Sequence, residues 1–103
     1  MSGYALHPEA FNDLDDIRSY IAEDSPDAAD RLLEELFDTF RALALSPQQG
    51  FRRRDLSSRP LRFILVRDYL IAYAPDEEPL WVVAVMHGRR NPRVIAAMLR
   101  GRE

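Results

Sequence analysis

The residues best suited to chemistry stand together near the C-terminus, where an apolar run ends at His87 and is followed by Gly88, Arg89 and Arg90. An imidazole titrates near neutral pH and can move a proton, whereas two guanidinium groups can hold a phosphate or a carboxylate. Three kinds of site share this composition: an RNA-cleaving centre, a surface that binds a protein, and a turn with solvated charges.

Cleavage of RNA through its 2′-hydroxyl needs a base, an acid for the leaving oxygen and positive charge on the phosphate. All fourteen basic residues are arginines, and arginine stays protonated and is a poor proton shuttle. Beyond Arg90 the chain has neither tyrosine nor histidine. The pattern therefore favours binding, and only His87 keeps a nuclease alternative open. The other interpretation of His87 is a strand-end histidine that hydrogen-bonds the backbone.

Arg89 and Arg90 also precede a predicted helix start, where free backbone N–H groups favour an anion. Together with Arg93 they are the candidate target-binding residues, suited to protein carboxylates, DNA phosphates or an acidic segment of a partner. If this group were instead catalytic, His87, Arg89 and Arg90 would be the residues involved. A solvated turn stays the alternative to both.

A second basic run lies in the middle of the chain at Arg52, Arg53 and Arg54. With Arg62, which alternates off the apolar face of a predicted strand, it forms a candidate basic patch that would extend the first. The alternative is a solvated loop, which consecutive charges usually indicate. Packing in the core or at an interface is the interpretation for five larger side chains: Tyr69, Tyr73, Trp81, Met86 and Met98.

Charge is distributed unevenly along the chain. Residues 1–51 carry eleven acidic side chains and three arginines, whereas residues 52–103 carry eleven arginines and six acidic side chains. Because nucleic-acid affinity depends on neutralising phosphates, any DNA contact is predicted for the C-terminal half, and the net charge of −3 argues against general nucleic-acid binding. With no cysteine and two histidines, neither a metal site nor a cofactor is predicted.

The first half is predicted to form a short strand and two helices. Residues 4–7 alternate and end at Pro8, which is typical of a strand. From there apolar residues recur at intervals of three and four, which predicts a helix with Asp13 and the acidic residues after it mostly on the outer face. Ser25 and Pro26 are a cap and a first residue for a second, longer helix. The short connection predicts an antiparallel helical hairpin.

The second half changes to a period of two. Three strands are predicted, at residues 61–68, 69–74 and 80–87. Leu65 is expected on the buried face of the first strand, Asp68 and Tyr69 in the first turn, and the acidic residues 75–79 in the second, which together give an antiparallel meander. A short strand at residues 51–53 is a weaker prediction. A final helix is predicted from its cap, first residue and stop: Asn91, Pro92 and Gly101.

These elements predict the α+β class: an N-terminal strand, an antiparallel helical hairpin packed on a small, mainly antiparallel β-sheet, and a short C-terminal helix. No linker divides the chain, so residues 1–103 are expected to form one domain. The apolar runs are too short to span a bilayer and the N-terminus does not resemble a secretory signal, so a cytoplasmic location is expected.

Two long segments of the chain resemble the RelE/ParE family of toxins from type II toxin–antitoxin modules. The first is YALHPEAFNDLDDIRSYIAEDSPDAADRLLEELFDTFRALALSPQQG and the second is LRFILVRDYLIAYAPDEEPLWVVAVMHGRRNP. The resemblance covers roughly residues 4–93, and the order and spacing of its pieces match the elements predicted above. It implies the fold just described and a toxic activity.

The resemblance implies one of two activities. RelE-like members cleave mRNA in the ribosomal A site, using lysines, arginines and a tyrosine or histidine near the C-terminus, whereas ParE-like members inhibit DNA gyrase and have no known nucleolytic centre. This chain departs from the nuclease pattern, so it is closer to the ParE-like branch, a binding protein and not an enzyme. The alternatives are a RelE-like endoribonuclease, acting on ribosome-bound mRNA, and a related protein with another target or no toxicity.

The resemblance also implies a cognate antitoxin. We expect a ParD-like protein with an acidic C-terminal segment, which forms a hetero-oligomer with the toxin and can add a helix or a strand to its surface. Because the predicted helices have wide apolar faces, part of that surface is expected to stay exposed in the free chain and to make it poorly soluble.

Overall fold

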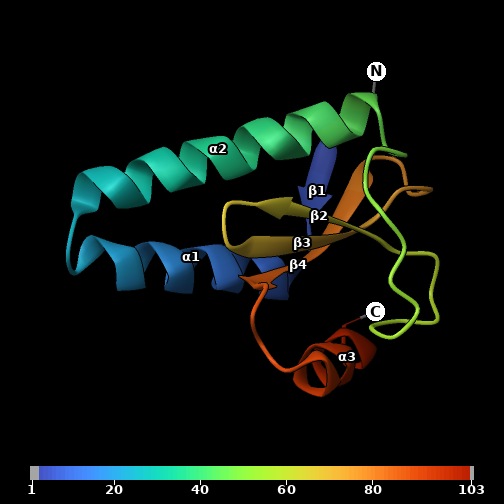
Figure 1. Cartoon of the computed structure of the whole chain (residues 1–103). Coiled ribbons are helices and arrows are strands. Elements are labelled where there is room, and N and C mark those ends of the chain that lie inside the picture. Colours follow the sequence, from blue (N-terminus) through green and yellow to red (C-terminus); the bar gives the residue numbers. More distant parts are fainter. Residues whose placement is uncertain (1–2, 103) are drawn as a thin grey trace.

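The computed structural model describes residues 3–102, in which a four-stranded sheet lies between a helical hairpin and a single helix (Figure 1). Along the chain the elements are β1 (Tyr4–Leu6), α1 (Pro8–Ala22), α2 (Pro26–Leu45), β2 (Arg62–Val66), β3 (Tyr69–Ala74), β4 (Leu80–His87) and α3 (Pro92–Arg100). The strand order is β1-β4-β3-β2; β1 is parallel to β4, and the other pairs are antiparallel. The predicted α+β class is confirmed.

The helical hairpin forms because each helix has a cap at its start. Nδ1 of His7 accepts from the backbone N–H of Glu9 at 3.0 Å, and Oγ of Ser25 accepts from that of Ala28 at 3.2 Å. Each cap is followed at once by a proline, which has no N–H to leave unpaired. The helices run antiparallel because only residues 23–25 separate them.

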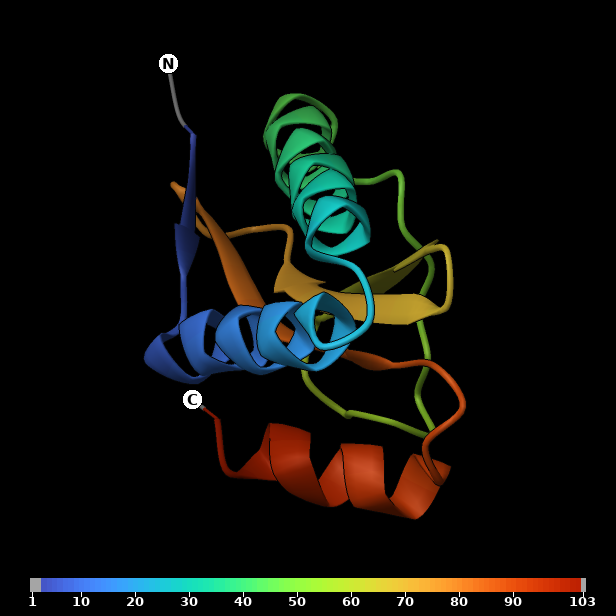
Figure 2. The same cartoon turned by 90° about the vertical axis from the view of Figure 1, so that its left-hand side faces the viewer.

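The sheet is buried on both faces, with the hairpin on one side and α3 on the other (Figure 2). Side chains alternate between the two cores along β3: Ile71 and Tyr73 face the hairpin, and Leu70 and Ala72 face α3. The hairpin contributes Ala10, Leu14, Leu32, Leu36, Phe40 and Leu43 to its core. The other core is completed by Leu56, Leu61, Phe63, Ile95 and Leu99.

Strand β4 contains a β-bulge opposite Ala72 and Tyr73 of β3. Ala72 of β3 pairs with Ala84 and Tyr73 pairs with Val82, so Val83 is an extra residue on β4. Val83 and Ala84 consequently both belong to the α3-side core. On its other edge β4 is paired with β1 only over residues 80–82, so the rest of this edge needs other partners.

The first hairpin turn was predicted one residue too late. It is formed by Arg67 and Asp68, and Tyr69 is the first residue of β3, paired with Val66. Arg67 has φ of 54°, the left-handed conformation that two-residue hairpins require. Its guanidinium binds Glu35 of α2 with Nε–oxygen distances of 3.0 Å and an NH2–oxygen distance of 2.6 Å. This long-range contact joins the turn to α2, and sequence spacing cannot show it.

Two further expectations for this half need correction. Leu65 is 55% exposed, because it lies near the end of edge strand β2, on the face that α3 covers only in part. The short strand predicted at residues 51–53 is reduced to one bridge, in which Phe51 and Phe63 exchange two backbone hydrogen bonds of 2.8 Å.

The large side chains assigned to the core are buried to different extents. Tyr73 and Met86 are fully buried, whereas Tyr69, Trp81 and Met98 are half-buried beside the two cores.

Across residues 3–102, none of the helices combines the length and apolar character needed to cross a membrane.

Candidate target-binding site

A pocket of about 460 Å³ opens between α1, the adjoining ends of β3 and β4, and α3. Its apolar lining comes from Ile17, Val85, Met86 and Met98. Its polar lining comes from Asp13, Asp16, Tyr20, Tyr69, His87 and Arg90. An apolar surface bordered by a few convergent polar groups is typical of a binding site, and this one contains two of the candidate site residues, His87 and Arg90.

His87 is the last residue of β4 and stands opposite Tyr69, the first residue of β3. The two rings are in edge contact, with centroids 5.5 Å apart. Nδ1 of His87 accepts a hydrogen bond of 3.1 Å from the backbone N–H of Arg89. The ring therefore stabilises the turn after its own strand, as one of the two sequence interpretations expected, and Nε2 is left as its second polar atom.

Tyr69, which contacts His87, contributes a phenol to the lining of the pocket. Its pKa is raised above the ordinary value, first by burial and then by electrostatic repulsion from Asp68 and from Tyr20. The phenol is therefore neutral at physiological pH, and it can donate a hydrogen bond or a proton but cannot act as a base. Packing at an interface, one of the expected roles for this residue, fits its half-buried position.

Arg89, Arg90 and Arg93 are exposed and lie in the turn after β4 and the first turn of α3. Within residues 3–102 none of their guanidinium groups forms a hydrogen bond or an ion pair. The turn itself is held by backbone bonds, from Gly88 N–H to the carbonyl of Asp68 at 2.8 Å and from Arg90 N–H to that of His87 at 3.2 Å. Of the three arginines, Arg90 lines the pocket.

The start of α3 does not supply the free backbone N–H groups that the sequence suggested. Pro92 has none, and Oδ1 of Asn91 accepts from Arg93 N–H at 2.9 Å. The carbonyl of Asn91 accepts from Val94 N–H at 2.9 Å and from Ile95 N–H at 3.1 Å. Because residues 92–95 have every N–H paired, an anion at this turn would contact the guanidinium groups and not the helix backbone.

The candidate basic patch is only partly available for binding. Arg53 holds Asp55 in a two-point ion pair of 2.8 and 2.7 Å, which lowers the pKa of that carboxyl. Arg62 donates to the carbonyl of Gly50 at 2.7 Å. Arg52 and Arg54 are exposed and make no ion pair in the described part of the chain.

Arg62 is also remote from the pocket. It pairs with Tyr73, at the end of the β2–β3 ladder opposite to Val66 and Tyr69. Four residues of extended strand separate the two ends, about 13 Å. Arg62 therefore lies at the other end of its strand from the pocket, and the extension of the candidate basic patch to the turn after β4 stays a prediction.

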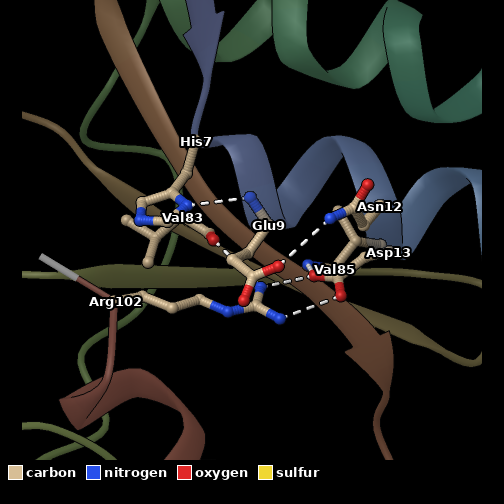
Figure 3. A network of polar contacts seen from close by, with 7 residues as sticks. All are labelled: His7, Glu9, Asn12, Asp13, Val83, Val85 and Arg102. Atoms are coloured by element: carbon tan, nitrogen blue, oxygen red, sulfur yellow. Dashed lines mark hydrogen bonds and ion pairs between the residues drawn. The ribbon is translucent and has the colours of Figure 1, made fainter.

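Asp13 was expected mostly on the outer face of its helix, but it points at β4 (Figure 3). Its Oδ2 accepts from the backbone N–H of Val85 at 3.0 Å, and its two oxygens bind Arg102 at 2.5 and 3.0 Å. Spacing could have indicated this, because Asp13 lies three residues after Ala10 and four before Ile17, both of which pack inward. Arg102 itself was not singled out, since nothing local in the sequence links it to Asp13.

A family profile described as "ParE toxin of type II toxin-antitoxin system, parDE" matches residues 4–92. The chain belongs to the ParE toxin family. Two curated relatives, both named Toxin ParE2 and from Mycobacterium tuberculosis strains CDC 1551 / Oshkosh and H37Rv, are each 29% identical in an alignment of 102 residues, which covers 94% of this chain and 91% of the relative. As a ParE-type toxin of a type II toxin–antitoxin system, the protein has an implied antitoxin partner. The matched range contains His87, Arg89 and Arg90, and it ends before Arg93 and Arg102.

Proposed function

We propose that this ParE-family toxin inhibits DNA gyrase, and so replication, by binding it through Arg89, Arg90, Arg93 and the pocket beside them. The supporting observation is that three exposed guanidinium groups, unpaired within residues 3–102, lie in the turn after β4 and in the first turn of α3, and that one of them, on Arg90, lines a largely apolar pocket. Other arginines of the chain are engaged in internal ion pairs: Arg18, Arg41, Arg53, Arg67 and Arg102. Arginine, tyrosine and methionine around a desolvated centre are typical of protein-binding surfaces.

A second candidate is a RelE-like endoribonuclease, and one specific observation favours it. His87, Tyr69 and Arg90 line the same pocket, so an imidazole, a neutral phenol and a cation for phosphate are close together. Against it, the nearest carboxylate, Asp13, is bound to Arg102 and to the backbone, which removes a ready second base. Binding therefore has the stronger support.

The same charges suggest how the antitoxin neutralises the toxin. The helical hairpin carries most of the acidic residues, whereas the turn before α3 is arginine-rich. An acidic C-terminal segment of a ParD-like antitoxin is attracted to the turn and repelled by the hairpin. Its binding there would cover the arginines proposed to contact the target, in a toxin–antitoxin hetero-oligomer.

The decisive experiment compares the two targets with one protein preparation. Purified toxin is incubated with gyrase, ATP and supercoiled plasmid, and separately with translating ribosomes. In the gyrase reaction we expect linear DNA that is released from gyrase by detergent and protease. In the ribosome reaction we expect the mRNA to stay intact. Cleaved mRNA together with unaffected gyrase would refute gyrase inhibition and support the second candidate, which His87→Gln should then inactivate.

A paired variant tests the assigned residues. Arg89→Ala/Arg90→Ala should weaken gyrase inhibition about five- to thirtyfold, because two interface arginines together contribute on the order of 1–2 kcal/mol. The matched control is Arg31→Ala/Arg41→Ala, which removes two exposed arginines from α2. Full potency of the first variant, or equal losses in both, would remove the site assignment even if gyrase is the target.

A further inference from the structure

We propose that Asp13 and Arg102 are positioning residues that hold α3 against the sheet and so assemble the pocket between α1 and α3. The consequence for target binding rests on the proposed function, but the structural role does not. The starting point is the exposed edge of β4, where its neighbour β1 ends after three residues.

Side chains take the place of a strand along that edge. The last backbone partner is His7, whose N–H donates to the carbonyl of Val82 at 2.9 Å. Beyond it, Arg102 NH1 donates to the carbonyl of Val83 at 3.2 Å, and Oδ2 of Asp13 accepts from Val85 N–H at 3.0 Å. The two side chains bind each other as well (Figure 3). One network thus joins α1, the edge of β4 and the segment after α3.

The network is largely shielded from water. The side chains of Arg102 and Asp13 are only 10% and 16% exposed. Removing either partner leaves the other charge buried without its counter-ion, and the remaining partner then gains by moving into solvent. For Arg102 that movement would release the C-terminal end of α3, because only Gly101 separates it from the helix.

Few other contacts hold α3 in place. Ile95 and Leu99 are buried and Met98 is half-buried, while the turn before the helix is exposed. A helix of nine residues has little stability of its own. At the C-terminal end of α3, Arg59 NH1 donates to the carbonyls of Leu99 and Arg102 at 2.9 and 2.6 Å. These hydrogen bonds also help to hold residues 99–102 in place.

The pocket depends on this attachment because its lining comes from both sides. Ile17 and Tyr20 belong to α1, Met98 belongs to α3, and Arg90 lies in the turn that leads to α3. Asp13 is at once a pocket residue and the attachment point for Arg102. The ion pair therefore sets the separation between α1 and α3, and with it the position of Arg90.

Hydrogen exchange of the α3 amides tests the structural role directly. Arg102→Met and Asp13→Asn are compared with Arg100→Met and Asp15→Asn, which change exposed neighbours by the same substitutions. Well below the melting temperature, exchange at residues 96–100 should rise about tenfold or more in the first two variants and stay unchanged in the controls. Arg102→Lys should be intermediate, because an ammonium cannot hold both Asp13 oxygens and the Val83 carbonyl in one geometry.

The gyrase assay then separates positioning from simple stabilisation. At a temperature where every variant is folded, loss of inhibition should follow the order of α3 exchange, with Arg102→Lys restoring part of the potency. If Asp13→Asn fails to fold, a chain ending at Gly101 removes Arg102 and leaves α1 unchanged. Wild-type exchange in Arg102→Met and in this shortened chain would overturn the proposal. Full gyrase inhibition by a variant whose α3 amides exchange rapidly would also overturn it. If the wild-type toxin itself does not inhibit gyrase, only the proposed function is refuted.

Discussion

One phenol ties the long loop after α2 to the sheet. The hydroxyl of Tyr73 accepts from Gly50 N–H at 2.9 Å and donates to the carbonyl of Pro47 at 2.8 Å, and burial raises the pKa of this phenol. Gly50 is required there by contact distance: a Cβ would lie 2.5 Å from the Tyr73 hydroxyl and 2.7 Å from the carbonyl oxygen of Phe63. Since the loop leads into β2, this contact helps to set the start of the sheet's edge strand.

Tyr73→Phe tests that contact. It leaves Gly50 N–H buried without an acceptor, so the free energy of unfolding should fall by about 1–3 kcal/mol in urea denaturation. Tyr69→Phe is the matched control, because its hydroxyl has no hydrogen-bond partner in residues 3–102 and its removal should change stability by less than about 0.5 kcal/mol. Equal losses in the two variants would mean that the two hydrogen bonds of the Tyr73 hydroxyl add nothing to stability.

At the level of elements, α2 and the β2–β3 turn are joined by the ion pair of Glu35 and Arg67. Hydrogen bonding to Arg67 is the main cause that lowers the pKa of Glu35 below its ordinary 4.5. A carboxyl whose pKa is lower in the folded state stabilises that state above pH 4.5, and this contribution is lost as the pH falls through the lowered pKa.

The melting temperature of Glu35→Gln should therefore lie below that of the wild type at neutral pH and converge with it in acid. Glu34→Gln is the matched control, since its carboxylate is exposed and has no partner in the described residues. Thermal melts between about pH 2.5 and pH 7 give the comparison. A difference that is constant with pH would show that packing of the side chain, and not its charge, explains the effect.

The elements were more predictable than the contacts between them. The caps at Ser25 and Asn91 and the alternation of the strands are local signals, and both are confirmed. The first hairpin turn was misplaced because it contains no glycine to mark it, and nothing local in the sequence indicates the positive φ of Arg67. The hydrogen bond from His87 to the backbone was one of two alternatives that the sequence predicted. The role of Arg102 could not be predicted from the sequence. That role depends on where β1 stops and on the extra residue in β4, which only the folded register reveals.

Across the whole molecule, apolar side chains remain exposed on the hairpin, as expected from its wide apolar faces. Phe11 is 63% exposed and borders a groove of about 140 Å³ between α1 and α2, which is also lined by Leu14, Leu33 and Phe37. Such surfaces promote association when no partner covers them. We expect the free toxin to self-associate through this face.

Phe11→Ser should reduce that association and leave the melting temperature nearly unchanged, because the ring is mostly in solvent already. Val94→Ser is the matched control, an equally drastic change at an exposed apolar residue of α3 (52% exposed). Sedimentation velocity over a range of concentrations measures the effect. Dissociation by Val94→Ser and not by Phe11→Ser would move the self-association surface to α3.

The way the edges of the sheet are completed has a consequence for how such aggregates form. β1 offers three residues before a helix begins, the remaining edge of β4 is occupied by Asp13 and Arg102, and Phe51 occupies β2 at Phe63. Little continuous edge is left for one chain to extend the sheet of another. Clusters of free toxin should accordingly be amorphous and dissolve on dilution, without the ordered cross-β growth that stains with thioflavin T.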